Sequence, residues 1–93
     1  MTPAKGDVAQ LERLLAESGR TRLNATAGAS SLLVTSADEN GVQRERFRLV
    51  AIPNHKYRAE IAEGGRWKNP GISGLLEKVV ADILKRPEFK PVD

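Results

Sequence analysis

The chain contains no cysteine and only one histidine among its 93 residues. The lack of cysteine excludes disulfides, thiolate metal sites and thiol nucleophiles, and a single histidine excludes a metal site built of histidines alone. The longest apolar run, Leu49 to Ile52, is far shorter than the roughly 20 residues of a membrane-spanning helix. No apolar stretch of the kind found in signal peptides follows Met1. We therefore expect a cytoplasmic protein with no metal, no cofactor and no contact with a membrane.

Residues that suit catalysis are also scarce. The adjacent carboxylates Asp38 and Glu39 fall in a predicted turn, where burial strong enough to shift a pKa is not expected. His55 lies in a second predicted turn with no carboxylate or nucleophile at a recognisable spacing, so we interpret it as a solvated loop residue. A chain of 93 residues leaves little room for a substrate pocket. We therefore expect no enzymatic activity.

What is present is the composition of a globular chain. Hydrophobic residues make up 40% and charged residues 29% of the sequence, although aromatic residues reach only 4%. These fractions differ from the low hydrophobicity and high charge that keep a chain disordered. The length suits one domain, so we expect residues 1–93 to share a single core.

The N-terminal segment has the pattern of an amphipathic helix. Asp7 is a favourable N-cap, and Gln10 stands where a variant of the capping box places it. Gly19 suits the left-handed residue that often follows a helix. The apolar positions recur on one face, and they are Val8, Leu11, Leu14 and Leu15. The pattern predicts a helix over residues 7–18.

The C-terminal segment has a wider apolar face at helical spacing, formed by Ile72, Leu75, Leu76, Val79, Val80, Ile83 and Leu84. Asn69 and Pro70 suit a helix start, and Pro87 prevents continuation. We therefore predict a helix over residues 70–86 and an extended tail over 87–93.

Residues 21–63 read as strands separated by turns. Asn40-Gly41 is the strongest turn signal, because a type I′ hairpin turn requires positive φ at both central residues. A two-residue loop at this position pairs Thr35 with Arg46. One face of the hairpin then carries the apolar pairs Val34/Phe47 and Leu32/Leu49, and the other face carries Arg44, Arg46 and Arg48.

A third strand is predicted over residues 56–63. Its apolar residues share a face with those of the hairpin only if the connecting loop has an odd number of residues, as residues 53–55 provide. The inner pairs are then Ala51/Tyr57, Leu49/Ala59 and Phe47/Ile61, and the outer pairs are Val50/Arg58 and Arg48/Glu60. A weaker alternation over residues 21–26 indicates a possible fourth strand at the edge.

Together these elements predict an α+β fold. We expect an antiparallel β-meander of three or four strands with the N-terminal and C-terminal helices packed on one face. The predicted core comprises Leu11, Leu14, Leu15, Val34, Phe47, Leu49, Ile61, Leu76, Val79, Val80 and Ile83.

The net charge of +3 arises from fifteen basic and twelve acidic residues. The excess lies in residues 42–68, where basic residues outnumber Glu45, Glu60 and Glu63. These basic residues and the single tryptophan form the predicted partner-binding set, which is Arg44, Arg46, Arg48, Lys56, Arg58, Arg66, Trp67 and Lys68. A clustered excess of this kind attracts anionic partners.

Three interpretations of this surface remain open. The first is a solvated sheet face, since antiparallel sheets normally expose a polar side. The second is a protein-binding face, because tryptophan and arginine are common hot-spot residues; alternatively, Trp67 packs over the end of the core. The third is sequence-independent binding of RNA or single-stranded DNA through phosphates.

We favour a small non-catalytic binding or regulatory module that contacts another protein through this face and the rim around Trp67. A second copy of the chain is one such partner, because Leu33 and Val50 place apolar atoms on the same face and a two-fold dimer would cover them. Nucleic-acid binding through the same arginines is the alternative.

Overall fold

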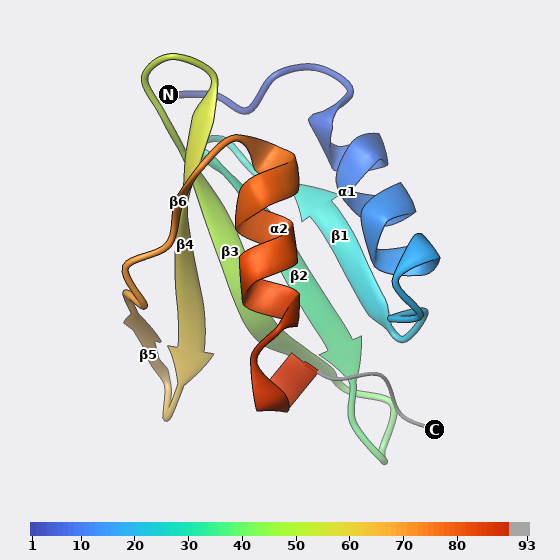
Figure 1. Ribbon diagram of the computed structural model, residues 1–93. Helices are drawn as coiled ribbons and strands as arrows, with labels where there is room; N and C mark the ends of the chain where they lie inside the picture. Colours follow the sequence, from blue (N-terminus) through green and yellow to red (C-terminus); the bar gives the residue numbers. More distant parts are fainter. Residues whose placement is uncertain (90–93) are drawn as a thin grey trace.

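Both helices lie on one face of a single antiparallel sheet, as the computed structural model shows for residues 1–89 (Figure 1). Residues 90–93 of the predicted tail lie outside the described part of the chain. The elements in order are α1 (Asp7–Glu17), β1 (Leu23–Ala27), β2 (Ser31–Ala37), β3 (Gln43–Ile52), β4 (Lys56–Glu63), β5 (Arg66–Lys68), β6 (Ser73–Gly74), α2 (Leu76–Leu84) and a 3₁₀ turn, η1 (Pro87–Phe89).

The strands follow the order β1-β2-β3-β4-β5, and β6 pairs with another part of β4. The predicted α+β meander is therefore confirmed, and the weakly indicated fourth strand is present as β1. Two further strands, β5 and β6, were not predicted. They contain three and two residues, which is too short for an alternation pattern to be recognised.

The core lies between the sheet and the helices. All predicted core residues are buried except Leu14, which packs against the cluster and is partly buried. Phe89 joins the core from η1 and is only 4% exposed. Its ring meets Phe47 edge-on, with the centroids 5.2 Å apart. The predicted extended tail is therefore wrong for residues 87–89, because this aromatic contact draws the chain back onto the sheet.

Helix α1 begins as predicted but not by the predicted cap. Gly6, at φ 96°, occupies the N-cap position, and no side chain of residues 1–89 caps the helix. Asp7 is 7% exposed and points into the molecule, where its Oδ2 accepts a 2.5 Å hydrogen bond from the Tyr57 hydroxyl. A buried phenol requires an acceptor, and this tertiary contact displaces the local cap. At the other end, Gly19 is left-handed (φ 83°) as predicted.

Helix α2 is shorter than predicted, because residues 70–75 and 85–86 are not part of the helix. Gly71 and Gly74 have φ of 78° and 142°, which no helix contains. Instead, Ser73 and Gly74 form β6 against β4, and the N–H of Ala59 donates to the carbonyl of Ile72 at 2.9 Å. Both glycines permit this path, and sheet hydrogen bonds replace the helical ones.

The β3–β4 pairing matches the prediction at every residue, whereas the β2–β3 pairing matches only as far as Val34/Phe47. Beyond that pair, Thr35 faces Glu45 instead of Arg46, so Arg46 is the extra residue of a β-bulge. The predicted two-residue turn is also wrong. Of the two central residues, Gly41 has a positive φ (79°) and Asn40 does not. The Asp38 carboxylate accepts N–H bonds from Asn40 and Val42 at 2.9 and 3.0 Å.

No helix within residues 1–89 is long and apolar enough to cross a membrane.

Candidate binding surface

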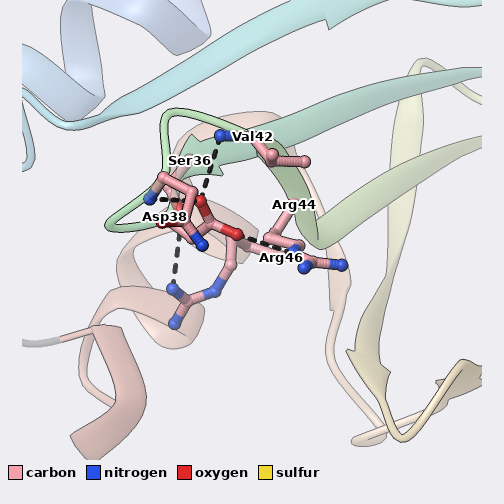
Figure 2. A network of polar contacts seen from close by, with 6 residues as sticks. Ser36, Asp38, Val42, Arg44 and Arg46 are labelled. Atoms are coloured by element: carbon pink, nitrogen blue, oxygen red, sulfur yellow. Dashed lines mark hydrogen bonds and ion pairs between the residues drawn. The ribbon is translucent and has the colours of Figure 1, made fainter.

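The bulge moves Arg46 away from the sheet face on which it was predicted. Its guanidinium donates to the hydroxyl of Ser36, a buried residue, at 3.3 Å and to the Glu88 carbonyl at 3.2 Å, on the helix-covered side of the sheet. It also lies 5.4 Å from the centroid of the Phe89 ring. Figure 2 shows Arg46 directed toward Ser36 in the polar network at this end of the sheet. Arg46 therefore attaches η1 to the sheet and does not share the sheet face of Arg48.

Arg44 is likewise occupied at the hairpin. Its Nε lies 3.1 Å from Asp38 Oδ2 (Figure 2). Its position on β3 is opposite Ser36 of β2. The backbone N–H of Val42 lowers the pKa of Asp38, and the N–H of Asn40 and the Arg44 guanidinium act in the same direction. The contacts of Arg44 and Asp38 therefore stabilise the turn, and the prediction that Arg44 joins Arg48 on one face is wrong.

Arg48, Lys56 and Arg58 do lie on the sheet face opposite the helices, which we call the outer face. The predicted Arg48/Glu60 pair is confirmed, with Arg48 Nε 2.6 Å from Glu60 Oε1. Arg58 Nη2 approaches the second oxygen of Glu60 at 3.7 Å. Glu45 takes the outer position that the predicted register gave to Arg46. The outer face consequently carries mixed charge.

Trp67 lies on the outer face and not over the end of the core. Trp67 is on β5 opposite Ala62 of β4. Ala62 lies two residues after Glu60, so both are on the outer face of the sheet. The Arg48 guanidinium carbon lies 4.2 Å from the centroid of the Trp67 ring. Arg48 is thus held by the Glu60 carboxylate and by a cation–π contact, which together limit the motion of a normally flexible side chain.

The other two predicted rim residues point away from Trp67, because β5 alternates like any strand. Arg66 faces Glu63, and Lys68 faces Ile61. Lys68 Nζ lies 3.7 Å from Glu63 Oε2, with both side chains about two-thirds exposed. The predicted set of eight residues is therefore divided among the hairpin end, the outer face and the β5 margin.

Half-buried apolar side chains lie beside the charged residues of the outer face, among them Leu33 and Val50. Leu33 is opposite Arg48, and Val50 is opposite Arg58. No helix of residues 1–89 covers them, because α1 and α2 both pack on the other side (Figure 1). We call the resulting group the outer-face cluster, and its members are Leu33, Arg48, Val50, Arg58, Glu60 and Trp67.

A second polar group lies at the other end of the sheet. The Asp7 Oδ2 that accepts from Tyr57 also lies 3.3 Å from His55 Nε2. Burial and the Asp7 carboxylate raise the pKa of Tyr57 to about 12. His55 is 64% exposed but not fully solvated as interpreted, since it contacts a carboxylate distant in sequence. Tyr57 remains a proton donor to Asp7 near neutral pH, so the contact links α1 to β4.

Comparison of the chain with protein-family models, curated proteins and solved structures finds no significant match. Within residues 1–89, no three His, Cys, Asp or Glu side chains lie close enough together to hold a metal ion. The function proposed below is therefore inferred from the geometry of the chain's own residues.

Proposed function

We propose that the chain is a non-catalytic binding module whose outer-face cluster contacts another protein. The observation that carries the proposal is the position of Arg48, held between the Trp67 ring and the Glu60 carboxylate beside the half-buried side chains of Leu33 and Val50. Tryptophan and arginine dominate binding energy in protein interfaces. A side chain that is already ordered loses less entropy when a partner binds.

The same cluster indicates the chemistry of the partner. Leu33 and Val50 favour an apolar contact. Arg58 is 45% exposed, and its contact with Glu60 is long, at 3.7 Å. Arg58 therefore has N–H groups available for a further acceptor. We therefore propose a protein surface with an apolar centre and a carboxylate at its margin. Arg58 would meet that carboxylate as Leu33 and Val50 become covered.

The corrected register gives less support to nucleic-acid binding through this face. Arg44 and Arg46 are engaged elsewhere, and Glu45 brings a negative charge onto the face. Phosphate binding depends on several unpaired cations. Single-strand binding also uses open aromatic faces, whereas Arg48 already stacks on Trp67.

The proposal is tested by capture followed by reconstitution. A protein retained from a lysate by the parent chain should be purified and its dissociation constant measured against the parent and variants. We expect Trp67→Ala to weaken binding at least about tenfold, as loss of a hot spot does. Arg66→Ala is the matched control, because it changes the neighbouring residue of β5 on the opposite side, and it should bind as the parent does. Equal effects of the two substitutions would place the interface elsewhere.

Nucleic-acid binding is tested separately with labelled single-stranded RNA and DNA at low salt. We expect no measurable binding. Affinity that falls with salt at a slope of about −0.7 to −0.9 per phosphate contact would support the alternative function instead, and its loss in Lys56→Ala/Arg58→Ala would assign it to the outer face.

A further inference from the structure

The two edges of the sheet are built differently. At one edge, β5 is three residues long and carries Arg66 and Lys68, and charged residues on a short strand discourage further strand pairing. At the other edge, β1 has the sequence LNATA, without charge or proline, and its pairing with β2 contains no bulge. Among residues 1–89, β1 pairs only with β2. The β1 edge therefore lacks the features that usually prevent association.

The backbone of β1 has hydrogen-bonding groups available on its open side. Gly28 donates its N–H to the carbonyl of Ser31 at 2.7 Å, so these two residues form a hydrogen-bonded pair of the β1–β2 ladder. Alternation then directs the N–H and C=O groups of Asn24 and Thr26 toward β2, and those of Ala25 and Ala27 away from it. The N–H of Leu23 is already used by the Arg20 carbonyl at 3.1 Å. Ala25 and Ala27 can thus receive another strand.

Helix α1 does not close this edge. A hollow of about 310 Å³ lies between α1 and the edge, lined by Glu12, Ala16, Arg20, Leu23, Asn24 and others. Figure 1 shows β1 at the margin of the sheet with α1 beside it. Ala16 and Ala25 are small, so they leave room in the hollow, and Glu12 and Arg20 lie next to the path of a neighbouring strand.

The sequence of β1 is complementary to itself under two-fold symmetry. In an antiparallel pair of two β1 strands centred on Ala25, Ala25 of one copy lies opposite Ala25 of the other. The N–H and C=O groups of both residues point away from β2 and toward the second copy. Asn24 then lies opposite Thr26, where their polar side chains form a cross-strand pair. Arg22 lies opposite Gly28 and not opposite a second arginine. This register opposes no like charges.

We propose that two copies of the chain associate edge to edge through β1, with antiparallel pairing centred on Ala25, to form one continuous sheet. The two-fold axis is perpendicular to the sheet, so both outer faces lie on the same side. A second copy is the occupant that the register favours. This interface is separate from the outer-face cluster and does not depend on its function.

Sedimentation velocity over a range of concentrations tests the proposal, and we expect a reversible monomer–dimer equilibrium for the parent. Asn24→Lys/Thr26→Lys places like charges opposite each other at two symmetry-related pairs, and we expect the dimer dissociation constant to rise about tenfold or more. Both side chains are exposed, so circular dichroism and the melting curve of the isolated chain should show a folded protein. Gln43→Lys/Ser73→Lys adds the same charge away from β1 and should dimerise as the parent does.

A charge exchange identifies the register. Asn24→Glu/Thr26→Glu should also be monomeric alone, and an equal mixture with Asn24→Lys/Thr26→Lys should restore a dimer. A parent that stays monomeric up to its solubility limit would overturn the proposal and leave the edge to strands of other proteins. A dimer that persists equally in the lysine variant would also overturn it, because the interface would then lie elsewhere.

Discussion

Glu60 organises the outer face at the level of single residues. Its carboxylate contacts Arg48 at 2.6 Å and Arg58 at 3.7 Å, and its side chain is only 15% exposed. Glu60→Gln removes the charge and keeps the shape, so we expect the free energy of unfolding to fall by about 1 kcal/mol in urea denaturation. Glu63→Gln is the control, because Glu63 is 65% exposed and should change stability by less than about 0.5 kcal/mol. Equal losses would show that Glu60 does not organise the cluster.

Tyr57 gives a second prediction at this scale, because it is the only tyrosine and donates to Asp7. Its pKa rises from 10.0 to about 12 on folding. The protonated phenol is favoured in the folded state, so its contribution to stability is complete below pH 10.0 and is lost as the pH rises toward 12. Tyrosinate absorbance should therefore titrate later in the folded chain than in urea.

Tyr57→Phe removes this donor and leaves the Asp7 carboxylate partly unsatisfied. We expect a loss of about 1–3 kcal/mol at neutral pH. The difference in stability between parent and variant should shrink above pH 10, where the unfolded parent releases its phenolic proton. A difference that stays constant with pH would contradict the proposed protonation state of Tyr57.

At the scale of elements, the sequence predicts the strand pairings that the alternation of apolar and polar residues determines. The β3–β4 register was predictable because Phe47/Ile61 and Leu49/Ala59 must share the buried face across an odd loop. The bulge at Arg46 was not predictable from the sequence. It depends on the Asp38 carboxylate, which accepts a backbone N–H within the turn, and on the contact of Arg46 with Glu88 far along the chain. The start of α2 was misplaced because Ile72 and Leu75 match a helical pattern that two glycines interrupt. Most of the fold was therefore predictable, and the grouping of the arginines was not.

The bulge leads to a test of strand register. Deleting Arg46 leaves Thr35 opposite Glu45 and Val34 opposite Phe47, so every other cross-strand pair is kept. We expect this deletion to fold, with stability within about 1 kcal/mol of Arg46→Ala, because the deletion restores a regular ladder. Deleting Arg48 instead moves one part of β3 to the wrong face and should abolish cooperative unfolding. Urea denaturation followed by circular dichroism distinguishes the two deletions.

Across the whole molecule, polar side chains connect the elements around one core. Arg20 donates to the carbonyls of Ser18, Leu84 and Phe89 at 2.7, 2.7 and 2.8 Å, and so joins the ends of α1, α2 and η1. Asp7 joins α1 to β4, and β6 joins the start of α2 to the same strand. Because these connections share the core, the outer-face cluster should persist only while both helices remain packed.

Val80→Asp tests this dependence. Val80 lies within α2 and is 2% exposed, so an aspartate there buries an unpaired carboxylate at a cost of several kcal/mol. That cost is comparable to the whole stability of a small domain. We expect cooperative unfolding to be lost both in far-UV circular dichroism and in the fluorescence of Trp67, although Trp67 lies on the opposite face of the sheet. Leu75→Asp is the matched control, because Leu75 is 59% exposed and precedes α2, where an aspartate caps the helix. A folded Trp67 signal in Val80→Asp would show that the outer face is stable without the helices.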